Sequence, residues 1–66
     1  MEFSKIFIYL KRGHEIRLPE WGGYWYWKNN TIMIHTRKGE ELDIRETQDV
    51  DYTFSFICRN DWELVE

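Results

Sequence analysis

The segment Trp21–Trp27 carries five aromatic side chains within seven residues. Because successive side chains of a β-strand point to opposite faces, a strand here places Tyr24 and Tyr26 on one face. Trp25 and Trp27 then lie on the other face. A small core can bury one of these pairs, and the second pair must be covered by another subunit, stacked on a flat ligand or left exposed. The segment therefore points to recognition rather than to catalysis.

The chain is short, at 66 residues, and we expect one domain over residues 1–66. A domain of about 60 residues buries only roughly 60% of the surface that its unfolded chain exposes, so it usually needs a staple or a partner. Cys58 is the only cysteine, which excludes an internal disulfide, and no cluster has metal-ligand spacing. Self-association is therefore expected. A lone cysteine also fits a reducing cytoplasm better than an extracellular setting.

The charge balance argues against a nucleic acid polymer as the partner. Nine Lys and Arg residues face twelve Asp and Glu residues, for a net charge of −3, whereas binding of a phosphate backbone needs a basic surface. A small anion held by two or three cations remains compatible with this balance. The first apolar stretch, Ile6–Leu10, is too short for a membrane span or a signal peptide, so no membrane segment is expected.

The N-terminal residues have the spacing of an amphipathic helix. Four apolar residues recur at i, i+3, i+4 and i+7 and form one stripe: Phe3, Ile6, Phe7 and Leu10. Gly13, after the basic pair Lys11-Arg12, fits a helix stop. Ile8 and Tyr9 lie outside the stripe and favour a second packing partner.

Four segments downstream are predicted to be strands: Glu15–Leu18, Tyr24–Lys28, Thr31–Thr36 and Glu41–Glu46. The pair Asn29-Asn30 tolerates the left-handed backbone of a tight hairpin, and residues 37–40 form the next turn. The isoleucines of the third segment share one apolar face with Leu42 and Ile44 of the fourth. This pattern predicts an antiparallel meander with one apolar face.

The C-terminal third fits two patterns. Residues 50–58 alternate as in a strand, yet they also carry an apolar helical face. We favour a short helix over Thr53–Arg59, with Thr53 or Asp51 as its N-cap, and a closing strand over residues 62–65. The predicted fold class is α+β, with an N-terminal helix packed on a small antiparallel sheet and a short second helix near the C-terminus.

A catalytic centre is not expected. A hydrolase needs a nucleophile, a base and an orienting group, and no local signature surrounds Cys58, His14 or His35. Cys58, beside Phe56 and Ile57, is interpreted as a small buried apolar residue. The pair Gly22-Gly23 lacks the lysine and the following helix of a phosphate-binding loop. The sequence predicts a protein that is not an enzyme and that holds no metal and no cofactor.

Groups that bind nucleotides are better represented. Flat heterocycles stack on Trp and Tyr for about 1–3 kcal/mol per base, and phosphates pair with the arginine fork. Arg17 and Arg45 are expected to reach the same edge of the small sheet. Asp61 or Asp43 is placed to accept hydrogen bonds from a ribose or a base edge. The competing interpretation makes the tryptophans of the aromatic run core residues and the arginines ordinary surface residues.

The order of motifs resembles a known family. Four pieces carry the resemblance: Met1-x-Phe3 before a short helix, Leu10-Lys-x-Gly13-x-x-Ile16-Arg17, Trp21-x-Gly23-Tyr24, and Asn60-Asp61-Trp62-Glu63. In this combination the chain is similar to the small phage-encoded Thoeris anti-defence proteins of the second type, a family that some anti-CRISPR proteins also resemble. The resemblance spans nearly the whole chain.

The resemblance implies a small α+β fold that assembles into an oligomer, a tetramer or a dimer. It implies a sponge that binds cyclic nucleotide signals of bacterial immunity without cleaving them, in pockets between subunits. The implied ligands are cyclic ADP-ribose isomers and cyclic oligonucleotides, and the implied place of action is the cytoplasm of an infected bacterial host.

We therefore expect a non-enzymatic phage or prophage protein that sequesters such a signal and inhibits Thoeris or CBASS-type defence. Bases would stack on the aromatic run, arginines would meet phosphates, and an aspartate would fix a ribose or base edge. The expected ligand-binding residues are Arg17, Trp21, Tyr24, Trp25, Arg45 and Asp61. One alternative is an anti-CRISPR-like inhibitor that binds a host nuclease through its aromatic face, since aromatic and Arg residues dominate such interfaces. Another is a structural phage protein whose aromatic residues serve assembly alone.

Overall fold

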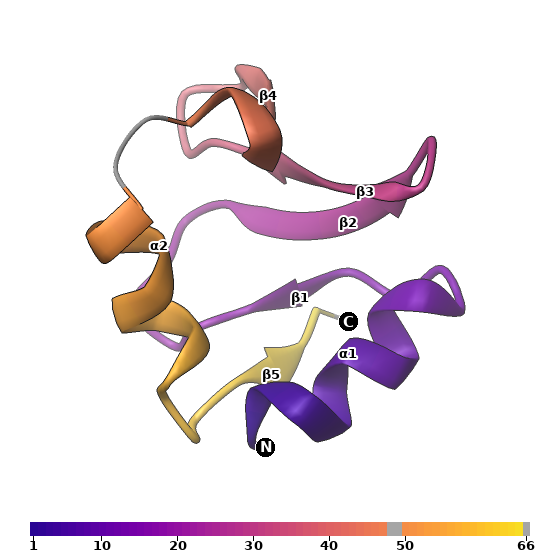
Figure 1. Cartoon of the computed structure of the whole chain (residues 1–66), viewed down its shortest axis with the longest axis vertical. Coiled ribbons are helices and arrows are strands. Elements are labelled where there is room, and N and C mark those ends of the chain that lie inside the picture. Colours follow the sequence, from indigo (N-terminus) through magenta and orange to yellow (C-terminus); the bar gives the residue numbers. More distant parts are fainter. Residues whose placement is uncertain (48–49, 66) are drawn as a thin grey trace.

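A computed structural model describes residues 1–47 and 50–65 as two helices and a five-stranded sheet (Figure 1). The elements in chain order are α1 (Phe3–Lys11), β1 (Ile16–Arg17), β2 (Tyr24–Lys28), β3 (Thr31–His35), β4 (Glu41–Asp43), the 3-10 helix η1 (Ile44–Glu46), α2 (Val50–Ile57) and β5 (Glu63–Leu64). The strand order is β4-β3-β2-β1-β5, and every neighbouring pair is antiparallel. The predicted α+β class is confirmed.

The β2–β3 hairpin sets the register of the sheet. Trp25 pairs with Ile34, and Tyr26 pairs with Met33. Asn29 and Asn30 both have positive φ, 55° and 59°, as a two-residue hairpin turn of right-handed twist requires. The predicted alternation is therefore confirmed, with the tryptophans on one face of the sheet and the tyrosines on the other.

The tryptophan face carries the core. Seven apolar residues are buried there: Ile6, Leu10, Ile16, Leu18, Trp25, Ile32 and Trp62. The helix α1 contributes its predicted stripe, and the Phe7 ring meets Trp27 edge-on with 5.7 Å between ring centroids. Phe56 and Ile57 of α2 pack against the same cluster, so both helices lie on this face of the sheet.

Trp62 lies at the centre of this core and is 1% exposed. Its ring centroid is 5.4 Å from that of Phe3, 5.2 Å from that of Trp21 and 5.0 Å from that of Trp25. Its indole Nε1 donates a hydrogen bond of 3.0 Å to the carbonyl of Phe56. One side chain thus joins both helices, the loop before β2 and β2 itself.

Several predicted boundaries shift. The fourth strand is shorter than Glu41–Glu46, because the Asp43 carboxylate accepts the Arg45 backbone N–H at 2.8 Å and starts η1. The second helix begins at Val50, so both proposed N-cap residues, Thr53 and Asp51, lie inside it. The interpretation of Cys58 as buried is also wrong, since this thiol is exposed after the end of α2.

The other predicted elements are found with small changes in length. The first strand covers only Ile16–Arg17, and the closing strand covers Glu63–Leu64, which pairs with it. Ile8 and Tyr9 remain exposed at 53% and 36%, and no described element covers them. In the described part of the chain, no helix has the length and apolar character to cross a membrane.

The two adjacent glycines before β2 differ in how closely the chain approaches them. A Cβ on Gly23 would lie 2.1 Å from the carbonyl oxygen of His35, which belongs to the paired strand β3. A Cβ on Gly22 would meet only the side chain of Arg37, at 2.8 Å from its Cγ. The β3 backbone crowds Gly23, whereas the flexible side chain of Arg37 crowds Gly22.

We predict that Gly23→Ala lowers the free energy of unfolding by about 1–3 kcal/mol, because the β3 backbone must move to admit the methyl group. Urea denaturation followed by tryptophan fluorescence measures the change. Gly22→Ala is the matched control and loses less, since the arginine stem can rotate away. Equal losses in the two variants would contradict this explanation.

Candidate functional site

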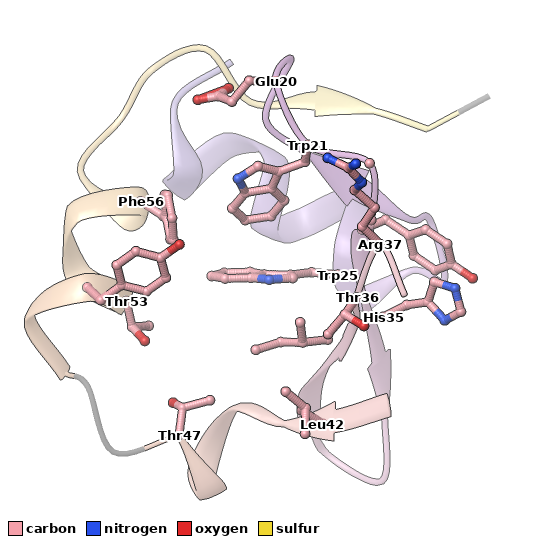
Figure 2. Close-up of a pocket in the computed structure, with 15 residues that line it drawn as sticks. Glu20, Trp21, Trp25, His35, Thr36, Arg37, Leu42, Thr47, Thr53 and Phe56 are labelled. Atoms are coloured by element: carbon pink, nitrogen blue, oxygen red, sulfur yellow. The ribbon is translucent and has the colours of Figure 1, made fainter. Parts of the chain in front are cut away.

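A pocket of about 460 Å³ opens between α2 and the β3–β4 side of the sheet (Figure 2). This volume lies within the range of small-molecule sites, roughly 300–1,000 Å³. Its lining is mainly aromatic and aliphatic: Trp21, Trp25, Ile34, Leu42, Tyr52 and Phe56. The rest of the lining consists of Gly22 and Gly23 and of polar residues: Glu20, Tyr24, His35, Thr36, Arg37, Thr47 and Thr53.

The pocket exists because α2 covers the sheet only in part. No described side chain of this helix is fully buried, and its contacts with the core come from Phe56 and Ile57 near its end. In the first turn, Val50 is 58% and Tyr52 is 61% exposed. On the facing strands Leu42 is 38% exposed and Ile34 is half-buried. Apolar surface is thus left open between helix and sheet.

Two of the expected ligand-binding residues form the inner wall of this pocket. Trp21 is half-buried, and its ring meets that of Phe56 at 4.9 Å and 89°, which joins the loop before β2 to α2. Trp25 is only 4% exposed and extends across the pocket toward α2 (Figure 2). Trp25 is therefore a core residue that presents little of its ring to the pocket.

Tyr24 also lines the pocket, but its ring turns to the opposite face of the sheet. There it stacks on the His35 ring, with 4.7 Å between centroids and 18° between planes. His35 Nδ1 lies 2.5 Å from Glu41 Oε1, and Glu41 accepts a hydrogen bond of 2.6 Å from the Tyr26 hydroxyl. This bond raises the pKa of the Tyr26 phenol to about 12 and lowers that of the Glu41 carboxyl.

The three expected charged residues lie outside the pocket. Arg17 Nε donates to Glu63 at 2.9 Å, across β1 and β5. Arg45 forms a fork with Asp43, and its hydrogen bonds lower the pKa of that carboxyl to about 2. The expectation that Arg17 and Arg45 reach one edge of the sheet is wrong, because β2 and β3 separate β1 from β4.

Asp61 belongs to an ion-pair group at the base of the loop before β2. Arg59 donates to Asp61 and, from the other side, to Glu20. These hydrogen bonds lower the pKa of both carboxyl groups. Glu20, which lines the pocket, thus has its charge offset in part by Arg59, which it shares with Asp61. The group ties the loop before β2 to the segment between α2 and β5.

Sequence reasoning missed the outer wall and the cation of the pocket. Tyr52, Thr53 and Phe56 come from a helix whose predicted start falls three residues late, after Tyr52. The sequence places Arg37 only in a turn, whereas in the structure its aliphatic stem lies across Gly22, where a side chain would collide with it. The adjacent glycines were the available signal, because a residue without a Cβ often marks a close approach.

Other clusters offer less chemistry. Within residues 1–47 and 50–65, no group of three His, Cys, Asp or Glu side chains can hold a metal ion. No family model matches this chain, and searches of curated proteins and of solved structures find no match. The aromatic pocket is therefore the strongest candidate for a functional site among the described residues.

We predict that Arg59→Gln raises the pKa of Glu20 and of Asp61 toward their ordinary values. Hydrogen bonds from Arg59 are the largest cause of the lowered pKa of each carboxyl group. A carboxyl group whose pKa is lowered by folding stabilises the fold at pH values above its unfolded-state pKa. This stabilisation is lost as the pH falls through the folded-state pKa. The melting temperature of the variant should thus fall below that of the unsubstituted protein at neutral pH, and the difference should shrink on acidification.

The titration of side-chain carboxyl carbons by NMR measures the two pKa values directly. Arg12→Gln is the control, since Arg12 is exposed and forms no ion pair within the described residues. Unchanged carboxyl titrations in Arg59→Gln would show that the ion-pair group does not form in solution.

Proposed function

We propose that this chain is a non-enzymatic immune-evasion protein of a phage or prophage. It acts as a sponge that binds and sequesters cyclic nucleotide signals, either cyclic ADP-ribose isomers or cyclic oligonucleotides, and so inhibits Thoeris or CBASS-type defence. The observation that carries the proposal is the pocket of about 460 Å³ with aromatic rings and an arginine in its lining.

The lining suits a base better than a purely polar ligand. The Phe56 ring contacts those of Tyr52 and Trp21 edge-on, so the three rings form one continuous aromatic wall. Base–aromatic stacking contributes about 1–3 kcal/mol per base. Leu42 and Ile34 supply aliphatic contact on the sheet. Glu20, the one carboxylate in the lining, is paired with Arg59 and so repels a phosphate less than a free carboxylate would.

Retention without cleavage also fits this lining. His35 is the one imidazole among the lining residues, and its ring points away from the cavity (Figure 2). It contacts Glu41 on the opposite face of the sheet instead. A ligand in the pocket would thus meet stacking surfaces and hydroxyl groups, with no imidazole turned toward it as a general base.

The sponge is proposed to act as a homo-oligomer, a dimer or a tetramer, in the cytoplasm of the infected host. Two apolar side chains, Ile8 of α1 and Val50 of α2, stay more than half exposed outside the pocket lining and support this part of the proposal. A 66-residue chain gains stability when a second copy covers such groups. Sedimentation equilibrium at micromolar concentration is expected to give a mass above that of one chain. A folded monomer would refute it.

A nuclease inhibitor of the anti-CRISPR kind is the second candidate. The rings of Tyr24 and Tyr26 lie on the sheet face opposite both helices, and no described element covers that face. Tyrosines in such a position are typical of protein interfaces. Co-purification with a host nuclease, together with no binding of cyclic nucleotides, would favour this function.

The deciding experiment is isothermal titration of the purified protein with cyclic ADP-ribose isomers and with cyclic di- and trinucleotides. We expect nanomolar binding of at least one compound and recovery of that compound intact after denaturation of the protein. A folded protein that binds none of them would refute the proposal.

Two exposed aromatic residues of α2 form a matched pair of variants. Tyr52 lines the pocket and is 61% exposed, whereas Phe54 lies outside it and is 56% exposed. We predict that Tyr52→Ala weakens binding of the cyclic nucleotide about tenfold, the loss of one stacking contact, and that Phe54→Ala leaves affinity within twofold. Equal losses, or no loss in either variant, would locate the ligand elsewhere.

A further inference from the structure

The arginines of this chain differ in whether a carboxylate already neutralises them. Arg17, Arg45 and Arg59 each form an ion pair with a neighbouring Glu or Asp. Arg37 is exposed, lines the pocket, and has no ion pair or side-chain hydrogen bond within residues 1–47 and 50–65. Among the described residues, it is the cation of the lining that no carboxylate neutralises.

The fold holds Arg37 at the rim. Its Cγ and Cδ lie 2.8 Å and 2.9 Å from where a Gly22 side chain would begin, so the stem crosses the bare backbone of Gly22. Figure 2 shows the guanidinium near the Trp21 end of the pocket. A stem that packs against the backbone loses less rotamer freedom on binding than one free in solvent. The glycine and the arginine therefore act together, although they lie 15 residues apart.

We infer that Arg37 is the anion-binding residue of the pocket and that it receives the phosphate of a nucleotide whose base contacts the aromatic walls. The inference rests on the proposed function for the pocket but assigns its charged subsite, which the paired arginines Arg17 and Arg45 do not supply. The guanidinium fork presents two parallel N–H donors to a phosphate, whereas an ammonium acts as a point charge. A nucleotide therefore binds with its base inward and its phosphate at the end of β3.

The test compares two probes that differ by one phosphate, adenosine 5′-monophosphate and adenosine. Titrations up to millimolar concentration follow the quenching of tryptophan fluorescence in the unsubstituted protein, in Arg37→Gln and in Lys38→Gln. Lys38 is the matched control, because it is the neighbouring exposed cation and does not line the pocket. Circular dichroism confirms that each variant is folded.

We expect Arg37→Gln to weaken binding of the monophosphate about tenfold and to leave that of adenosine within twofold. Lys38→Gln should change neither. Arg37→Lys should recover only part of the lost affinity, because it restores the charge without the fork. Added salt should weaken monophosphate binding by the unsubstituted protein more than by Arg37→Gln.

Four results would overturn the inference: equal losses for both probes in Arg37→Gln, an unchanged monophosphate affinity in that variant, an equal effect of Lys38→Gln, or no binding of either probe. The proposed function is tested separately by titrating cyclic nucleotides into Arg37→Gln. Unchanged nanomolar affinity there would overturn the anion subsite and leave the sponge intact. The expected monophosphate pattern without any cyclic nucleotide binding would keep the subsite and refute the sponge.

Discussion

The packing of aromatic rings around Trp62 is the interaction on which the rest of the structure depends. Phe3 approaches this indole from α1, Trp21 from the loop before β2, and Trp25 from the centre of the sheet. Such ring pairs contribute about 0.5–1.5 kcal/mol each beyond the area that they bury. The chain has one cysteine and so no internal disulfide. The aromatic cluster therefore stabilises this domain as a disulfide stabilises other domains of this size. Trp21 and Trp25 of the same cluster form the inner wall of the pocket.

Much of the fold can be predicted from the sequence, because it depends on residues that are close together in the chain. Side-chain alternation separates the tyrosines from the tryptophans of β2, and the Asn29-Asn30 pair sets the hairpin register. The boundaries that failed depend on single contacts with no periodic signal. β4 ends early because the Asp43 carboxylate turns back to the Arg45 N–H. Residues 50–57 suit either a strand or a helix, and Phe56 and Ile57 pack on the core in the helical form.

The site divides along the same line. The aromatic run pointed to Trp21 and Trp25, which do meet at the pocket. The competing interpretation of these tryptophans as core residues holds for Trp25, whose burial leaves little of its ring free. Arg45 and Asp61 looked like free recognition groups, whereas each has an opposite charge two residues away and pairs with it. An opposite charge two residues away can be recognised in the sequence. A charged residue with such a neighbour is therefore a weak candidate for binding a ligand. The approach of Arg37 to Gly22 is different in kind, because it exists only once β2 and β3 are paired.

The outer strands of the sheet have a consequence for assembly. β4 gives way to η1 after three residues, and β5 consists of two. Charged side chains lie along these margins: Glu41, the ion pair of Asp43 with Arg45, and that of Glu63 with Arg17. Short, charged edges resist the addition of further strands, which is how fibrils and runaway sheets begin. Edge strands of different copies are therefore not expected to pair through their backbones. An assembly would form through side chains on the helices and sheet faces, and concentrated solutions should not form amyloid.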